Sequence, residues 1–161
     1  MKKAVRRKPP ALYHYRESGL DNVYLKDGFI RERDAKYGEL TSVVNTGELH
    51  KVIGAQLAAQ ANALNGKEIR FLRKELNLSQ RVLAQMLGVD EQTVARWEKD
   101  QIPMPRGNQL VLRSYYLDLQ LGDGKFRKLV ETLIAMDEQC VSKQKSFETI
   151  RKGAWRACVA Q

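Results

Sequence analysis

The sequence predicts a mainly α protein with a small β appendage, and three observations in its 161 residues support this fold class. Apolar residues recur at helical spacings of three, four and seven in several segments after residue 45. The stretch LSQRVLAQMLGVDEQTVARWEKD, residues 78–100, holds two short amphipathic segments with an abrupt turn between them. Residues 13–44 instead mix aromatic and β-branched side chains with turn signals, which favours a β-hairpin or small sheet.

These patterns divide the chain into four regions. Residues 1–12 are expected to be a basic, disordered tail, because five of the first ten are Lys or Arg, none is acidic and two consecutive prolines end the run. Residues 13–64 are predicted to hold a strand-rich region and a connecting helix, and 65–122 a bundle of short helices. Residues 123–161 are predicted to be a C-terminal helical extension.

The strand-rich region contains one clear turn signal. In NVYLKDGFIRER, Asp27 and Gly28 stand between two short candidate strands, a pattern typical of a β-hairpin. The segment AKYGELTSVV supplies a third candidate strand after Gly38.

Helical patterns begin at Asn45. Asn45 with Glu48 three residues later resembles a capping box, and the apolar stripe that follows predicts a helix. The stripe consists of Leu49, Val52, Ile53, Leu57, Ala61 and Leu64. Asn65 and Gly66 interrupt this helix, and Asn65 with Glu68 is predicted to cap the next one. That next helix has Ile69, Leu72 and Leu76 on one face and is expected to end near Asn77.

The stretch with the abrupt turn predicts two helices. Ser79 is a good N-cap for the first, and Gly88 suits the left-handed backbone that ends it. Asp90 is predicted to cap the second, with Val94 and Trp97 facing inward. Two helices joined by a short turn with a glycine form the helix-turn-helix arrangement, in which the first braces the second across a DNA duplex.

Two prolines limit the helix that follows. Pro103 and Pro105 block helix until about Asn108, after which QLVLRSYYLDLQL resumes it. Its residues expected to close the bundle are Leu110, Val111, Tyr115 and Leu119. One more long helix is predicted after a Gly-Asp-Gly segment, with a stripe formed by Phe126, Leu129, Val130, Leu133, Ile134 and Val141. The final segment, FETIRKGAWRACVAQ, shows no clear period, so no element is predicted for it.

Composition and charge narrow the function classes. The net charge of +9 and the isoelectric point of about 9.7 indicate a polyanionic partner. No apolar run approaches the roughly 18 residues of a membrane span, and the basic start lacks the apolar segment of a secretory signal. The two cysteines are far apart and form no CxxC, which argues against a disulfide framework or zinc finger and favours a reducing cytoplasm.

The sequence also lacks the common catalytic motifs. It has no P-loop, no GxSxG, no HExxH and no dinucleotide-binding glycine pattern. We therefore expect that the protein is not an enzyme and that it needs no cofactor and no metal.

The predicted second helix, residues 90–99, carries side chains that suit contact with DNA bases. Glu91, Gln92, Thr93 and Arg96 point away from the inward Val94 and Trp97. The surrounding segment, IRFLRKELNLSQRVLAQMLGVDEQTVARWEKDQIPMP, resembles the XRE, or Cro/repressor-like, helix-turn-helix family over residues 66–119. The matching positions are Arg73, Leu76, Leu78, Ser79, Gln80, Leu83, Ala84, Leu87, Gly88, Val89, Thr93, Val94, Trp97 and Glu98. One departure is Asp100, where the family usually has glycine.

This resemblance implies a five-helix-type helix-turn-helix DNA-binding domain over residues 65–122. It implies a sequence-specific regulator of transcription that reads the major groove of double-stranded DNA, acts as a homodimer and lies in the cytoplasm with the nucleoid. Gln80 would contact phosphate and support the second helix, and Arg106 and Asn108 would meet the DNA backbone. The candidate DNA-binding residues are Ser79, Gln80, Arg81, Glu91, Gln92, Thr93, Arg96, Arg106 and Asn108, and Arg73 with Glu98 would form a structural ion pair.

The whole chain also resembles MqsA/YgiT-type antitoxin regulators, in which a strand-rich N-terminal region and a connecting helix precede such a domain. Those proteins often carry paired CxxC zinc ligands in the N-terminal region. This chain has none there, and His14 and His50 are too few to replace four ligands, so no zinc is expected. The resemblance of the whole chain gives the alternative function, which is an antitoxin or protein-binding module that neutralises a partner toxin and autoregulates its operon.

Overall fold

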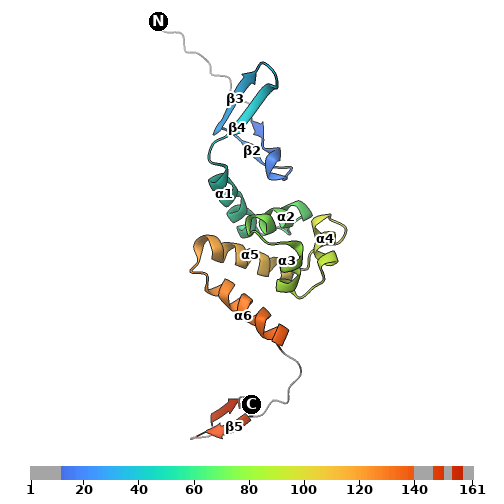
Figure 1. Cartoon of the computed structure of the whole chain (residues 1–161), viewed down its shortest axis with the longest axis vertical. Helices are drawn as coiled ribbons and strands as arrows, with labels where there is room; N and C mark the ends of the chain where they lie inside the picture. The colour runs from blue at the N-terminus through green and yellow to red at the C-terminus, as the bar shows by residue number, and fades with distance from the viewer. Residues whose placement is uncertain (1–11, 140–146, 151–153, 158–161) are drawn as a thin grey trace.

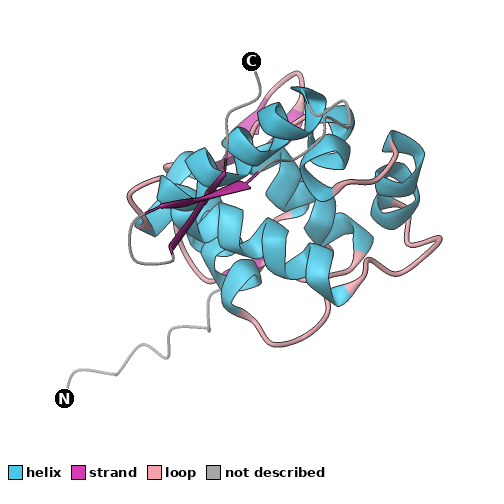
Figure 2. Cartoon of the chain, turned by 90° about the horizontal axis from the view of Figure 1, so that it is seen from below, coloured by secondary structure: helices cyan, strands magenta, loops and turns pink. Residues whose placement is uncertain are grey.

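Helices make up most of the described chain, and its strands form three separate two-stranded sheets. The computed structural model describes residues 12–139, 147–150 and 154–157. In Figure 1 the N-terminal strands lie at one end, α1 leads from them into a group of helices, and α6 leads away from that group. Figure 2 shows how far helices outweigh strands. The expected basic tail lies almost entirely outside the described residues.

The predicted hairpin at Asp27 and Gly28 is wrong, because the two strands that flank this turn do not pair with each other. β2 (Tyr24–Leu25) pairs with β1 (Tyr13–His14), and β3 (Phe29–Asp34) pairs with β4 (Gly38–Val43), both antiparallel. The strand expected after Gly38 is confirmed as β4. A 3-10 helix, η1 (Arg16–Ser18), lies between β1 and β2.

The physical reason lies in the turn after β3. The Asp34 carboxylate accepts the backbone N–H groups of Lys36 and Tyr37 at 2.7 and 2.8 Å, and Gly38 supplies the positive φ that returns the chain. These local hydrogen bonds give β3 a six-residue partner, whereas β2 is only two residues long. The turn at Gly28 instead connects one small sheet to the next.

Helix α1 (Thr46–Ala59) begins at the predicted cap, where the Asn45 side chain accepts the N–H of Glu48. It ends earlier than the apolar stripe suggested, because Gln60 is extended. Ala61 and Leu64 therefore lie in the linker to α2 (Gly66–Glu75) and not on α1.

Helix α2 begins with the predicted capping box. The Asn65 side chain accepts the N–H of Glu68, and the Glu68 carboxylate accepts the N–H of Asn65 at 2.9 Å. The predicted inner face of α2 is confirmed, because Ile69, Leu72 and Leu76 are all buried. They belong to one hydrophobic core, whose largest fully buried side chains are Tyr116, Ile69, Leu72, Leu83, Leu112 and Val94.

Helix α5 (Arg106–Leu121) starts two residues before the expected Asn108, directly after Pro105. Its predicted inner face is wrong in part: Tyr115 is buried, but Leu110 and Leu119 are exposed. Leu112 and Tyr116 fill the core instead. The buried Gln109 side chain fixes this rotation, because it donates to the carbonyl of residue 104 and accepts the N–H of residue 64.

Helix α6 (Lys125–Gln139) confirms the predicted long helix, although Val141 of the expected stripe lies outside the described residues. Its apolar residues divide between two faces. Phe126, Val130 and Ile134 are half-buried, and the last two line a groove beside α3 and α5. Leu129 and Leu133 are each 55% exposed.

The extension over residues 123–161 is not helical throughout. Beyond α6 the described residues form β5 (Phe147–Ile150) and β6 (Ala154–Ala157), which pair antiparallel with Phe147 opposite Ala157. Two short segments with aromatic and β-branched residues on either side of a glycine-containing link are a hairpin pattern. None of the described helices is long and apolar enough to cross a bilayer.

Candidate nucleic-acid interface

The two helices of the predicted motif are α3 (Gln80–Leu87) and α4 (Glu91–Glu98). The Ser79 hydroxyl accepts the N–H of Val82 at 3.1 Å and so begins α3. Gly88 ends it with a φ of 66°, a left-handed conformation that glycine adopts without strain. Only Gly88, Val89 and Asp90 separate the two helices, which gives the abrupt turn.

Asp90 begins α4 in the same way. Its carboxylate accepts the backbone N–H and the hydroxyl of Thr93, both at 2.8 Å. The side-chain hydrogen bond from Thr93, followed by the backbone one, holds the pKa of Asp90 below its usual value. Val94 and Trp97 are buried on the inner side of α4, so the opposite side of this helix faces solvent.

An ion pair fixes the end of α4 against α2. The Arg73 guanidinium contacts the Glu98 carboxylate twice, with Nε–Oε1 and Nη2–Oε2 distances of 2.5 and 3.0 Å. Both side chains are largely buried, and Arg73 also donates to the carbonyl of Leu78. Gln80 joins this pair by donating its amide to Glu98 Oε2 at 2.9 Å, which links the start of α3 to the end of α4.

The φ of Asp100, the residue that departs from the family's usual glycine, is 54°, in the left-handed region that favours glycine. The Asp100 carboxylate accepts the N–H of Gly66, the first residue of α2, at 2.6 Å. A side chain at Gly66 would approach the Trp97 carbonyl oxygen to 2.5 Å. The departure therefore keeps the turn and adds a contact between α2 and the end of α4.

The structure separates the candidate DNA-binding residues into two groups. Glu91, Gln92 and Arg96 are exposed on α4, and Gln92 and Arg96 lie one turn apart. Arg81 and Arg106 are exposed at the starts of α3 and α5. The rest are tied into the structure or partly covered: Ser79 and Thr93 take part in helix caps, Gln80 joins the ion pair, and Asn108 is half-buried.

Sequence reasoning missed one basic residue near this surface. Arg113 lies two turns after Arg106 on α5, and both line a cavity between α5 and the linker from α1 to α2. Its spacing of seven residues from Arg106, which is two helical turns, was the sequence signal that both side chains lie on one side of a helix. The expected late start of α5 concealed this spacing, because it left Arg106 outside the helix.

The described residues contain no group of three or more His, Cys, Asp or Glu side chains that could hold a metal ion. The two histidines are engaged in other ways. The His50 ring lies between the Tyr15 hydroxyl and the Glu75 carboxylate, at 2.9 Å from each. His14 stacks on Tyr24.

Comparison with known proteins agrees with this geometry. Residues 69–111, from α2 into the first turns of α5, match a protein family described as helix-turn-helix. This is a family of DNA-binding regulator domains and not of enzymes, so the match supports a DNA-binding transcription regulator of the XRE type. Comparison with curated proteins and with solved structures finds no match. The resemblance to MqsA/YgiT-type regulators and the antitoxin role therefore have no support from relatives.

Proposed function

We propose that the protein is a homodimeric, sequence-specific regulator that places α4 in the major groove of double-stranded DNA. One observation carries this proposal: Gln92 and Arg96 are exposed one turn apart on α4, and neither side chain forms a hydrogen bond with the described residues. The opposite side of α4 is buried, so these two side chains face outward.

The chemistry of the two side chains suits base recognition. A glutamine amide pairs with the N6 and N7 atoms of adenine, and a guanidinium pairs with the O6 and N7 atoms of guanine. The caps, the Arg73–Glu98 pair and the Gln80 contact hold α4 rigidly, so little order has to be gained on binding. Glu91 contributes where it accepts from a cytosine amino group, since phosphates repel its charge.

The remaining exposed candidates suit the DNA backbone. Arg81 and Arg106 stand at the first turns of α3 and α5, where guanidinium groups and helix N-termini attract phosphate. Such contacts set affinity and orientation without selecting a sequence.

Gln92→Ala and Arg96→Ala test base reading directly. Each should cost about 1–3 kcal/mol of binding free energy on a preferred DNA site and relax the choice at one base pair. Affinities would be measured at one salt concentration on a site selected from random DNA and on the same bases scrambled.

Two further variants make the comparison specific. Arg106→Ala should weaken binding to both DNAs alike, and Arg70→Ala, an exposed arginine on α2 outside the candidate surface, should change neither. If Gln92→Ala and Arg96→Ala lower both affinities equally, α4 does not read bases. If they change nothing, the helix-turn-helix is a scaffold only.

A further inference from the structure

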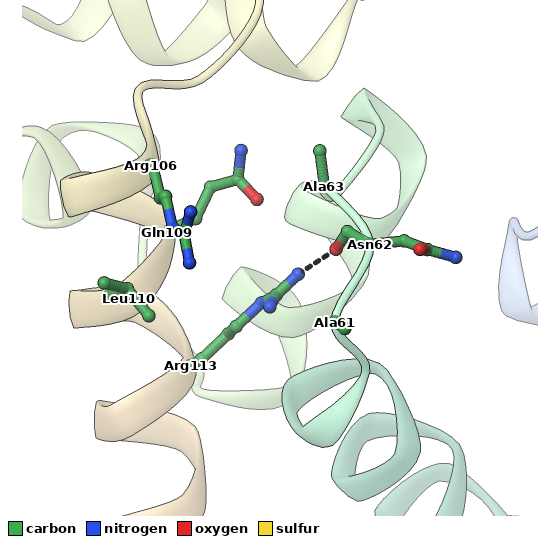
Figure 3. Close-up of a pocket in the computed structure, with 7 residues that line it drawn as sticks. All are labelled: Ala61, Asn62, Ala63, Arg106, Gln109, Leu110 and Arg113. Carbon is green, nitrogen blue, oxygen red and sulfur yellow. Dashed lines mark hydrogen bonds between the residues drawn. The ribbon is translucent and has the colours of Figure 1, made fainter.

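A cavity of about 440 Å³ lies between the first turns of α5 and the linker from α1 to α2 (Figure 3). Two of its lining residues are Arg106 and Arg113, which stand on one side of α5 because seven residues make two helical turns. The other lining side chains are alanines, one leucine and two amides, so the lining carries two positive charges and no negative one. Its size is within the range of small-molecule sites.

Arg113 is held in place without a counter-charge. Its Nη1 atom donates to the carbonyl of Gln60 at 2.7 Å. Its Nη2 atom donates to the carbonyl of Asn62, the contact drawn as a dashed line in Figure 3. No carboxylate pairs with Arg113 in the described chain. These two bonds use two of the five N–H donors of the guanidinium. Of the others, Nε–H is buried and has no partner within the described residues.

Arg106 adds a second positive charge. It is the first residue of α5 and is exposed, and its side chain forms neither a hydrogen bond nor an ion pair with any described residue. No side chain caps α5, so the free N–H groups and the positive end of its dipole lie at the same end of the helix. A buried N–H donor without a partner is costly, and the Nε–H of Arg113 is one among the described residues, so these features together favour an anion in the cavity.

We propose that this cavity binds a phosphate group, held between the guanidinium groups of Arg106 and Arg113. Guanidinium groups match the geometry of phosphate with paired hydrogen bonds, and Ala61, Ala63 and Leu110 offer apolar contact to the rest of a small ligand. The phosphate comes either from a free phosphorylated molecule or from the backbone of bound DNA. The site does not depend on base reading by α4, so it is testable whether or not the proposed function holds.

Sodium phosphate is the probe for the first experiment. The full chain, without DNA, is titrated with sodium phosphate and, in a parallel control, with sodium chloride at equal ionic strength. The arginine Nε–H signals are followed by NMR in both titrations. Phosphate should shift the Arg113 signal saturably, whereas chloride should not. A shift that grows linearly without saturation, or equally with chloride, overturns the proposal.

Variants identify the site. Arg106→Gln removes one guanidinium that makes no contact in the fold, and it should weaken phosphate binding about tenfold or more. Arg70→Gln is the matched control and should leave the phosphate affinity unchanged. Arg113→Gln should abolish saturable binding, but it also removes the bonds to the linker, so Arg106→Gln is the decisive variant. Equal phosphate affinity of Arg106→Gln and the unaltered protein overturns the proposal.

A second titration distinguishes the two sources. Protein saturated with DNA is titrated with phosphate under the same conditions. If the Arg113 signal has already moved and no longer responds, a DNA phosphate occupies the cavity. If it still responds, the cavity takes a free phosphorylated ligand, and the site is available to an effector while the protein is on DNA.

Discussion

Single polar side chains decide where the helices of this domain begin. Asn65, Ser79 and Asp90 each accept the backbone N–H of the residue three positions later. Each satisfies a donor that the first turn of a helix leaves without a partner. Because α3 and α4 are eight residues each, too short to be stable alone, these caps fix the positions of the side chains that α4 presents.

Replacement of Asp90 tests this role. Asp90→Ala should lower the urea midpoint of unfolding at neutral pH, whereas Asp90→Asn, which keeps a capping oxygen, should lower it less. The folded pKa of Asp90 lies below the ordinary value of 3.8, so its carboxylate stabilises the fold above that pH. The stability advantage over Asp90→Asn should therefore disappear as the pH falls through the folded pKa. A pH-independent difference in urea midpoint would contradict the assignment.

Tyr116 offers a second test, in which the substitution should raise the stability of the fold. Its side chain is fully buried, its hydroxyl has no partner within the described residues, and burial raises its pKa to about 12. Removing a buried hydroxyl without a partner relieves its desolvation cost, so Tyr116→Phe should raise the free energy of unfolding by up to about 1 kcal/mol. Tyr15→Phe is the control in the same urea experiment. It breaks a hydrogen bond to His50 and should lower stability by about 1 kcal/mol.

Pairs of elements are held by close approach as well as by apolar packing. Where α1 crosses α5, a side chain at Gly54 would meet the Tyr116 hydroxyl oxygen at 2.1 Å. Where α2 begins, Gly66 lies against the end of α4, which Glu98 ties to Arg73. These contacts set the orientation of α1 against α5 and of α2 against α4.

At the crossing of α1 and α5, we expect a Gly→Ala substitution to lower the stability of the fold, the opposite of its usual effect in a helix. Gly→Ala inside a helix normally stabilises by about 1 kcal/mol. Gly54→Ala should instead destabilise by about 1–3 kcal/mol, because the added methyl group meets Tyr116 in a packed core. Gly47→Ala, in the same helix with open space around it, should be neutral or slightly stabilising. Thermal or urea unfolding of both variants checks this, and similar values for the two would refute the close approach.

At the scale of the whole molecule, the proposed dimer must place two α4 helices on one side of the duplex, with half-sites about 10 base pairs apart. Leu129 and Leu133 form an exposed apolar strip on α6, four residues apart. The second candidate is the β3–β4 ribbon, where Ile30 and Leu40 are exposed on one face according to the strand register.

Two double variants distinguish these surfaces in sedimentation experiments. We expect Leu129→Glu with Leu133→Glu to produce monomers, because charges on both strips would face each other across the two-fold axis. Ile30→Glu with Leu40→Glu should leave the dimer intact. If only the variant with Ile30→Glu and Leu40→Glu is monomeric, the interface lies on the β3–β4 ribbon. If the unaltered protein is itself monomeric, the proposed dimer is ruled out.

Local patterns were sufficient where one short segment makes its own structure. The caps at Asn65, Ser79 and Asp90 and the turn at Gly88 depend on residues within three or four positions, so their sequence signals were reliable. The hairpin was misplaced because Asp27-Gly28 and Asp34–Gly38 both carry turn residues, and strand length and pairing decided between them.

The sequence by itself determined the helix-turn-helix and the outward positions of Glu91, Gln92 and Arg96 on α4, because helix period and capping are local properties. Tertiary structure alone decided which side of α5 enters the core, since the Gln109 side chain bonds to groups 45 and 5 residues away along the chain. Only the tertiary structure shows that Gln80 donates a hydrogen bond to Glu98 and that Asp100 accepts one from Gly66. It also shows that Arg106 and Arg113 line one cavity with the α1–α2 linker. Such contacts join segments far apart in sequence, and no local pattern encodes which of them meet.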